Sequence, residues 1–330
     1  MEKKKIIIFG ATGSTGVYLT DYLFKNINQE NYEIIAVGKR KTNYFNRFGI
    51  RYYSLDITEK RDLYVLPKNN IYALIILSGF LPARMESYCP ERYVDINIKG
   101  TLNIMEYFKN CGVDRVIYTV SISDLHGYLP ANKEFLPDMP IKYKYGTDHT
   151  IYAISKTAAT EIIKTYYHDY GIKYYILRLP NIYLYSPEKE YYVDCESRKI
   201  SYRYIIDKAI KGEDIELWGN PFQKRDIVYV KDFCQFIFKV TFIDADIGYY
   251  NVGADLMVSM KDQIEGIVEV FCKSNCKSKI IYCPEKRSCD DSHMNIEKAR
   301  NHLGYEPQYD YIMYLKDYKM EMESDRFNGL

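Results

Sequence analysis

The sequence lacks several features that would assign it to a specialised class of protein. It has 45 Lys and Arg residues against 44 Asp and Glu, so a net charge of +1 gives no overall basic character for binding nucleic acid. No apolar run approaches the roughly 18 residues that a membrane-spanning helix needs. No internal repeat or low-complexity tract is present. A collagen-like, disordered or membrane-spanning chain is therefore excluded, and a globular protein remains.

Secretion and metal binding are also poorly supported. Residues 1–10 combine basic residues with a short apolar run, but they lack the longer apolar segment of a secretory signal, so we expect a cytoplasmic protein. The last four of the eight cysteines are Cys272, Cys276, Cys283 and Cys289. Their spacing is wider than the tight pairs typical of zinc sites, so we predict reduced thiols and no metal site.

The order of apolar runs indicates the fold class. At 330 residues the chain has room for roughly two domains of about 150 residues each. The predicted strands are Lys5–Phe9, Glu33–Val37, Arg51–Leu55, Tyr72–Leu77, Arg115–Val120 and Lys173–Leu179. The predicted helices between them are Val17–Asn26, Glu91–Cys111 and Ile151–Tyr170. Continuous apolar strands that alternate with helices are typical of a doubly wound α/β fold of Rossmann type, with a parallel sheet covered on both faces.

The pattern loosens in the second half of the chain. We therefore predict the doubly wound domain over residues 1–181 and a smaller mixed α/β substrate-binding region over residues 182–330. Part of residues 225–255 is expected to return to the main sheet.

A glycine-rich turn follows the first predicted strand directly. Gly10, Gly13 and Gly16 recur at every third position immediately before the first predicted helix. In such a turn the glycines permit a tight bend, a close approach of backbone to a pyrophosphate, and close packing of helix on strand. The helix N-terminus adds unpaired N–H groups for the phosphates. The candidate cofactor-binding residues here are Gly10, Thr12, Gly13, Ser14, Thr15 and Gly16.

The end of the second predicted strand bears on the choice of dinucleotide. An acidic residue there usually accepts a hydrogen bond from the ribose 2′-hydroxyl of NAD. This chain instead has Gly38, Lys39 and Arg40, with no carboxylate. A pair of cations suits a 2′-phosphate, so the sequence favours NADP over NAD, with a solvated basic turn as the alternative interpretation.

Two residues of the third predicted helix form a candidate catalytic pair. Tyr152 and Lys156 are four positions apart and therefore lie on the same side of the helix. A tyrosine hydroxyl has a pKa near 10, and a neighbouring cation is expected to lower that pKa by stabilising the phenolate. Tyr152 would then move a proton at a substrate hydroxyl while hydride passes to or from a nicotinamide.

A further hydroxyl is expected where the fifth predicted strand ends. Ser121 and Ser123 follow that strand, and alternate side chains of an extended segment share a face. Either hydroxyl is placed to bind the same substrate oxygen as Tyr152.

These motifs together resemble the extended short-chain dehydrogenases/reductases of the NAD-dependent epimerase/dehydratase family, which modify nucleotide sugars. The resemblance spans nearly the whole chain. Further stretches that carry it are Asp56-Ile57, Leu77-Ser78-Gly79, residues 97–103, residues 178–183, residues 219–232, residues 250–253 and residues 303–307.

The resemblance implies roles for specific residues. Further cofactor contacts are expected at Asp56, Ile57, Leu77, Ser78, Gly79, Asn97, Tyr152, Lys156 and Pro180. Substrate contacts are expected at Ser123, Asn181, Arg225 and Arg287, with the arginines on the diphosphate. A homodimer through residues 91–111 and 151–170 is also implied.

The chain departs from the family pattern around the catalytic hydroxyl. Counting forward from Arg115 places that hydroxyl at Ser121, whereas counting back from Gly127 places it at Ile122. A one-residue insertion reconciles the two counts, so we favour Ser121 and keep Ser123 as the alternative. The dehydratases of the family carry an Asp-Glu pair directly after this hydroxyl, and Ile122-Ser123 stands there instead. Dehydration is therefore disfavoured.

The sequence thus predicts an NAD(P)-dependent epimerase or reductase that transfers hydride at a nucleotide-sugar carbon, with C4 as the favoured position. The alternatives are a non-catalytic NAD(P)-sensing protein on the same fold and a reductase of a carbonyl compound that carries no nucleotide. The five histidines lack the spacing of metal ligands and are expected on the surface or in loop packing. They are His126, His149, His168, His293 and His302.

Overall fold

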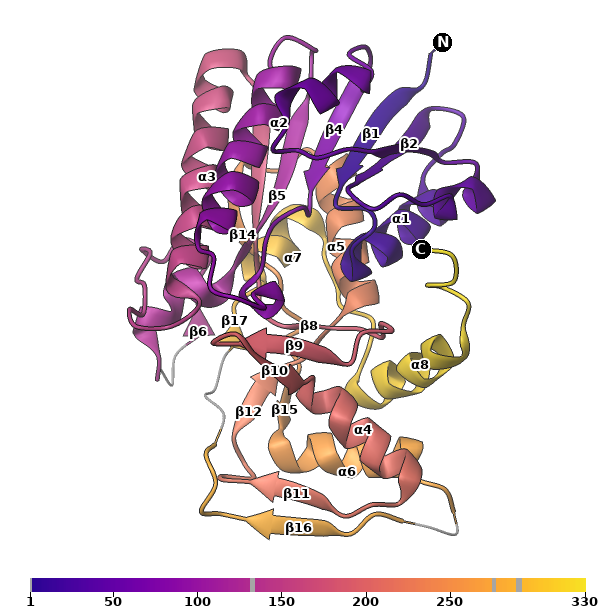
Figure 1. Ribbon diagram of the computed structural model, residues 1–330, viewed down its shortest axis with the longest axis vertical. Helices are drawn as coiled ribbons and strands as arrows, with labels where there is room; N and C mark the ends of the chain where they lie inside the picture. Colours follow the sequence, from indigo (N-terminus) through magenta and orange to yellow (C-terminus); the bar gives the residue numbers. More distant parts are fainter. Residues whose placement is uncertain (1, 131–133, 275–276, 289–292) are drawn as a thin grey trace.

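A seven-stranded parallel sheet forms the centre of the protein (Figure 1). The computed structural model describes residues 2–130, 134–274, 277–288 and 293–330. The strand order is β14-β7-β5-β4-β1-β2-β3. The strands are β1 (Lys4–Phe9), β2 (Tyr32–Gly38), β3 (Arg51–Ser54), β4 (Ile71–Ile76), β5 (Arg115–Ser121), β7 (Lys173–Leu179) and β14 (Gly248–Asn251). Every pairing in this sheet is parallel, so the predicted doubly wound fold is confirmed.

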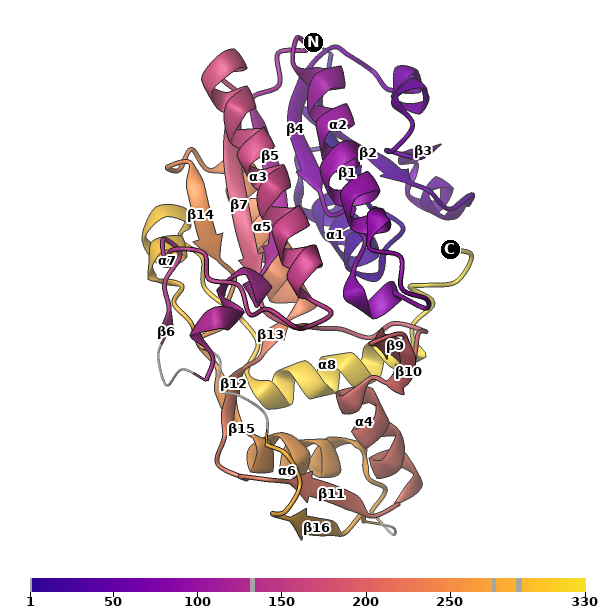
Figure 2. The ribbon, with the colours of Figure 1, turned by 60° about the vertical axis from the view of Figure 1, so that its left-hand side comes forward.

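The continuous apolar strands are explained by helices on both faces of the sheet. Ile6 and Ile8 of β1 belong to one hydrophobic core, which includes residues of α1 (Ser14–Asn26) and α5 (Val230–Phe242). Ile7 and Phe9 point the other way, into a second core. That core includes residues of α2 and α3 on the opposite face (Figure 2); their bounds are Gly100–Phe108 and Thr150–Tyr170. Both faces of β1 are therefore covered and excluded from water, so apolar residues occur at successive positions instead of alternating with polar ones.

The topology creates a crevice at the carboxyl edge of the sheet. From β1 the chain runs outward through β2 and β3, and then returns to β4 on the other side of β1. At such a switch point the turns that follow neighbouring strands diverge and leave space for a ligand. The glycine turn, the loop after β4 and the serines after β5 all lie at this edge.

Two predicted helices differ in detail from the structure. Helix α1 begins at Ser14 rather than Val17, because Gly13 is extended (φ −75°, ψ 158°) and serves as the N-cap. The predicted helix 91–111 contains a π-helical segment, Tyr93–Lys99, directly before α2.

The second half of the chain contributes to the sheet and also forms a separate lobe (Figure 1). Strand β14 pairs with β7, and α5 packs against α1. The lobe contains β9 (Glu190–Val193), β10 (Glu196–Lys199), α4 (Ser201–Lys211), β11 (Ile215–Trp218), β12 (Lys224–Asp226), β15 (Met257–Ser259), α6 (Met260–Phe271), β16 (Ile280–Cys283) and α8 (Tyr311–Glu323). Within the described ranges, no helix is both long enough and apolar enough to cross a membrane.

The shorter elements complete the chain. Strands β6 (Glu134–Phe135) and β17 (His293–Met294) pair with each other, as do β8 (Ile182–Tyr183) and β13 (Val228–Tyr229). Helix α7 (Glu297–Leu303) precedes α8. Short 3₁₀-helical segments cover Tyr44–Phe48, Lys60–Val65, Pro82–Arg84 and Ile122–Tyr128.

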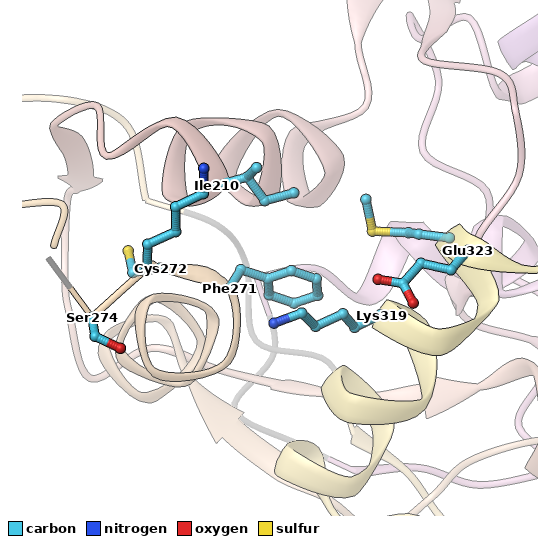
Figure 3. Close-up of a pocket in the computed structure, with 8 residues that line it drawn as sticks. Ile210, Phe271, Cys272, Ser274, Lys319 and Glu323 are labelled. Carbon is cyan, nitrogen blue, oxygen red and sulfur yellow. The ribbon is translucent and has the colours of Figure 1, made fainter. Parts of the chain in front are cut away.

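A cavity of about 700 Å³ lies in the lobe between α4, α6 and α8 (Figure 3). Phe271, Lys319 and Glu323 are among the side chains that line it. None of the residues predicted for cofactor, substrate or catalysis is part of its lining. The candidate site therefore has to be sought at the edge of the sheet.

Candidate functional site

The glycine turn after β1 is shaped so that only glycine fits at two positions. Gly10 has φ +87°, and a Cβ there would lie 2.7 Å from the backbone nitrogen of Ser78. A Cβ on Gly16 would lie 2.2 Å from the carbonyl oxygen of Gly10. Gly13 caps α1 without a side chain, and the first turn of α1 has no acidic residue. The N–H groups of that turn therefore suit a phosphate group.

The turn after β2 brings together Lys39 and Asp56, which the sequence predicted as separate cofactor contacts. The Lys39 Nζ lies 2.5 Å from the Asp56 Oδ2, and Arg40 is exposed beside it. Burial alone would raise the pKa of the Asp56 carboxyl, but the hydrogen bond from Lys39 helps to lower it below its ordinary value. A Cβ on Gly38 would lie 2.5 Å from the Thr12 Oγ1, so this position has no room for a carboxylate side chain.

The loop after β4 is held close to α3 by one buried amide. Asn97 accepts a hydrogen bond from the backbone N–H of Phe80 (2.7 Å) and donates one to the Ser155 hydroxyl (2.9 Å). A Cβ on Gly79 would lie 3.1 Å from the Asn97 Oδ1 and 3.5 Å from the Lys156 Nζ. This loop therefore runs past Lys156 at the distance of direct contact. The other predicted cofactor residues lie in the segments that follow β1, β3, β4 and β7: Thr12, Ser14, Thr15, Ile57, Leu77, Ser78 and Pro180.

Lys156 is a buried cation without a hydrogen-bond acceptor among the described residues. The residue is 4% exposed, and its Nζ lies 3.9 Å from the centre of the Tyr118 ring. Burial lowers the pKa of Lys156 to about 7. An ammonium group in this situation needs an acceptor from outside the protein. Ribose hydroxyls of a dinucleotide at the edge of the sheet fit that need.

Replacing Lys156 with Met is expected to raise the temperature of thermal unfolding, with the gain largest below pH 7. The pKa of Lys156 is lowered from 10.5 to about 7 in the folded protein. Below about pH 7 both states carry the proton, so folding bears the full cost of burying the charge. As the pH rises toward about 10.5 the folded protein releases the proton and the cost disappears. Thermal unfolding of both proteins at about pH 6 and pH 9 measures the difference.

The exposed Lys261 is a matched control for this prediction. Its side chain is 52% exposed, so Lys261→Met is expected to shift the unfolding temperature little at either pH. An equal gain for Lys156→Met at both pH values would contradict the account.

Tyr152 and the two serines meet at the end of β5. The Ser121 and Ser123 hydroxyl oxygens are 2.9 Å apart, and the backbone N–H of Ser123 also donates to the Ser121 Oγ. Tyr152 is 6% exposed. Burial raises the pKa of Tyr152, Tyr93 and Asp124 raise it further, and the Ser121 hydroxyl opposes them.

The expectation that Lys156 lowers the pKa of Tyr152 is therefore wrong for the protein alone. Both side chains are buried on the same helix, but Lys156 is not among the groups that shift the pKa of Tyr152. Desolvation of the phenolate is the dominant effect instead.

A cavity of about 310 Å³ is lined by Ser121 and Ser123. Its lining comes from the turn after β5, the start of α3, the segment after β7, and β12. The lining residues are Ser121, Ile122, Ser123, His126, Leu129, His149, Leu179, Pro180, Asn181, Tyr183, Arg225 and Asp226. The predicted substrate residues Ser123, Asn181 and Arg225 are thus brought together, whereas Arg287 is exposed and outside this lining. The role of Arg287 stays a prediction.

Two histidines line this cavity, although the sequence placed them on the surface or in loop packing. The rings of His126 and His149 lie 6.2 Å apart, and the His149 ring lies 6.4 Å from that of Tyr152. The sequence contained one usable signal, since His149 precedes Tyr152 by three positions, about one helical turn.

Asp124, which directly follows Ser123, forms a buried ion pair and is not part of the cavity lining. Asp124 accepts hydrogen bonds from the Arg178 Nε at 3.0 and 3.1 Å, and both side chains are 1% exposed. Arg178 also donates to the carbonyl oxygen of Pro137 and to Asn251 on β14. Asp124 therefore anchors the turn after β5 to Arg178 of β7. The disfavoured dehydration stays a prediction.

The described residues contain no group of three or more His, Cys, Asp or Glu side chains that could hold a metal ion. Cys276 and Cys289, part of the cysteine cluster considered above, lie outside the described residues.

Comparison with known proteins agrees with the resemblance drawn from the sequence. A model of the NAD dependent epimerase/dehydratase family matches residues 6–253. A putative UDP-glucose 4-epimerase from Methanocaldococcus jannaschii is 25% identical over 311 residues, which cover 92% of this chain and 94% of that protein. A UDP-glucuronate 4-epimerase from Thermodesulfobacterium geofontis is 25% identical over 315 residues, covering 92% of this chain and 91% of that protein.

Solved structures share the fold over almost the whole chain. An epimerase from Methanothermobacter thermautotrophicus superposes with a TM-score of 0.75 at 20% identity, covering 98% of this chain and 93% of that one. The UDP-glucuronic acid 4-epimerase from Bacillus cereus, crystallised with NAD, superposes with a TM-score of 0.71 at 18% identity, covering 97% of this chain and 100% of that one.

Proposed function

Because this chain belongs to the NAD dependent epimerase/dehydratase family, we propose that it is a nucleotide-sugar 4-epimerase that passes hydride between sugar C4 and a bound nicotinamide. One observation carries the proposal. The hydroxyls of Ser121 and Ser123 line a cavity that also contains Arg225. The Ser121 hydroxyl is close enough to lower the pKa of the buried Tyr152 by a hydrogen bond, and Tyr152 shares its helix with the buried cation Lys156. Relatives named as UDP-sugar 4-epimerases match 92% of the chain and support the same reaction.

Each group has a defined task in this reaction. The nicotinamide, when bound, supplies the hydride acceptor at C4. Tyr152 takes the proton of the C4 hydroxyl and later returns it, and Ser121 holds the same oxygen by a hydrogen bond. Lys156 donates hydrogen bonds to ribose hydroxyls of the cofactor. The N–H groups of the first turn of α1 bind the cofactor phosphates, and Arg225 binds the diphosphate of the substrate.

A second candidate is an NADPH-dependent reductase of a 4-keto nucleotide sugar. It is favoured by the turn after β2, where Lys39 and Arg40 are exposed and Gly38 leaves no room for a carboxylate. Cations at this position suit the 2′-phosphate of NADP. The solved relative from Bacillus cereus contains NAD, which supports the epimerase instead.

The protein is expected to act as a homodimer. Four apolar side chains are partly exposed on the segment before α2, on α2 itself and on α3: Val94, Leu102, Ile151 and Ile154. Burying them against the same helices of a second copy would remove this apolar surface from water.

The cofactor of the freshly purified protein and a substrate panel test both candidates. We expect retained NAD, and interconversion of UDP-glucose or UDP-glucuronate with its C4 epimer. Empty protein that prefers NADPH and reduces a 4-keto nucleotide sugar would establish the reductase instead. Inactivity in both arms, with cofactor bound, would overturn both candidates and favour the non-catalytic NAD(P)-sensing protein or a reductase of a carbonyl compound that carries no nucleotide.

A further inference from the structure

A histidine held by a carboxylate lies at the wall of the catalytic cavity. His149 directly precedes α3, and its Nδ1 lies 2.6 Å from the Asp148 Oδ1. The other oxygen of Asp148 is buried and has no hydrogen-bond partner among the described residues. A carboxylate on Nδ1 orients the imidazole and assigns proton exchange to Nε2. The ring is thereby prepared to act as a general base or acid.

The surroundings of His149 place it beside the groups that handle the C4 oxygen. Its ring is edge-on to the Tyr152 ring at 6.4 Å, and Ser121 and Ser123 line the same cavity. The other ionisable groups of the cavity lining are His126, on the turn after β5, Tyr183 on β8, and Arg225 and Asp226 on β12. The Tyr93 ring lies 5.9 Å from that of Tyr152. Burial raises the pKa of Tyr93, and the negative charge of Asp148 raises it further.

We propose that His149 is a second acid–base residue of this site, which removes and returns a proton at the carbon next to the C4 carbonyl. The inference rests on the proposed function, because only oxidation at C4 makes the hydrogens of C3 and C5 acidic. The electron pair of the broken C–H bond forms the enolate, and the proton moves to the His149 Nε2. Return of a proton to the carbon restores the ketosugar. No further oxidant or reductant is required.

The acidic and phenolic groups nearby differ in how far they are engaged. Asp124 is engaged by Arg178. The Asp226 Oδ1 accepts hydrogen bonds from two backbone N–H groups, which fixes the carboxylate against the backbone, whereas its Oδ2 is buried without a hydrogen-bond partner among the described residues. Tyr152 is needed at the C4 oxygen. His126 lies beside His149 in the same cavity, so the experiment has to separate the two histidines.

Proton exchange with deuterium oxide tests the proposal. The enzyme with its cofactor is incubated in deuterium oxide with UDP-glucose, UDP-glucuronate or, with NADPH, a 4-keto nucleotide sugar. Hydride transfer is followed by formation of the C4 epimer or, with NADPH and a 4-keto nucleotide sugar, by loss of the NADPH absorbance, and deuterium at C3 and C5 is followed by NMR. We expect deuterium to enter at C3 or C5. Hydride transfer at C4 alone leaves both C–H bonds intact, so deuterium at either carbon reports removal of a proton there.

Variants assign the exchange to one residue. His149→Gln is expected to lower the ratio of deuterium incorporation to hydride transfer by about 100-fold or more. Asp148→Asn is expected to lower the same ratio, because it replaces the carboxylate by a neutral amide, which accepts the Nδ1–H bond more weakly and does not stabilise the protonated imidazole. His168→Gln changes an exposed histidine near the other end of α3 and is expected to leave the ratio unchanged. Cofactor binding by each variant verifies folding.

The outcomes separate the inference from the proposed function. Hydride transfer without deuterium at C3 or C5, or exchange that depends on His126→Gln and not on His149→Gln, overturns the inference alone. Absence of hydride transfer with every nucleotide sugar overturns the proposed function, and the inference with it.

Discussion

Replacing Tyr152 with Phe is expected to lower kcat by about 10²–10⁴-fold, the usual contribution of a positioned acid–base group. The change removes one oxygen atom from a side chain that is 6% exposed and keeps the ring that packs against Tyr93. Folding and cofactor binding are therefore expected to survive. Steady-state kinetics with the active nucleotide sugar, together with titration of the cofactor, measures both effects.

The exposed Tyr170 provides the matched control at the carboxyl end of the same helix. It is 42% exposed, so Tyr170→Phe is expected to keep full activity. A Tyr152→Phe enzyme with undiminished kcat would show that another group moves the proton of the C4 hydroxyl. Equal inertness of the variant and the unmodified protein, with cofactor bound to both, would instead support a sensing role.

The sheet was predictable because its signal is local. Each central strand is a short run of Ile, Val, Leu and Tyr, and β1 buries successive side chains in two different cores. A helix on each face makes this continuous pattern necessary. The π-helical segment Tyr93–Lys99 was not predictable in the same way, because its apolar spacing also fits an ordinary helix.

The residues of the candidate site also separate into those predictable from local spacing and those that depend on contacts made by folding. The glycine turn and the Tyr152–Lys156 pair were predictable because their chemistry depends on spacing within one turn or one helix. The pairing of Lys39 with Asp56 and the placement of His149 depend on contacts between segments that folding brings together. The pKa of Tyr152 depends on burial, which spacing does not report.

Breaking the buried ion pair between Arg178 and Asp124, which follows the predicted catalytic serines, is expected to have the largest effect on stability. Arg178→Met leaves the Asp124 carboxylate, 1% exposed, without its cation, which typically costs about 3–5 kcal/mol. Burial already raises the pKa of Asp124 against the opposing effect of Arg178. Without the arginine that pKa rises further. The difference in stability between the variant and the unmodified protein is therefore expected to shrink as the pH falls, because the buried carboxyl becomes neutral.

Urea unfolding measures this prediction against a surface pair of the same kind. Arg198 is 54% exposed beside Glu196, so Arg198→Met is expected to cost about 0–1 kcal/mol. Adding Asp124→Leu to Arg178→Met is expected to recover part of the lost stability, because no uncompensated charge then remains buried. A loss for Arg178→Met no larger than that for Arg198→Met would contradict the account.

The same pair connects stability to catalysis. Asp124 follows Ser123 directly, and Arg178 joins that turn to β14 through Asn251. In the double variant no uncompensated carboxylate remains buried, but the contact between residues 124 and 178 that holds the turn in place is not restored. We therefore expect kcat to stay low while stability partly recovers. Recovery of both together would mean that the ion pair serves the fold alone and that the serines are positioned by other contacts.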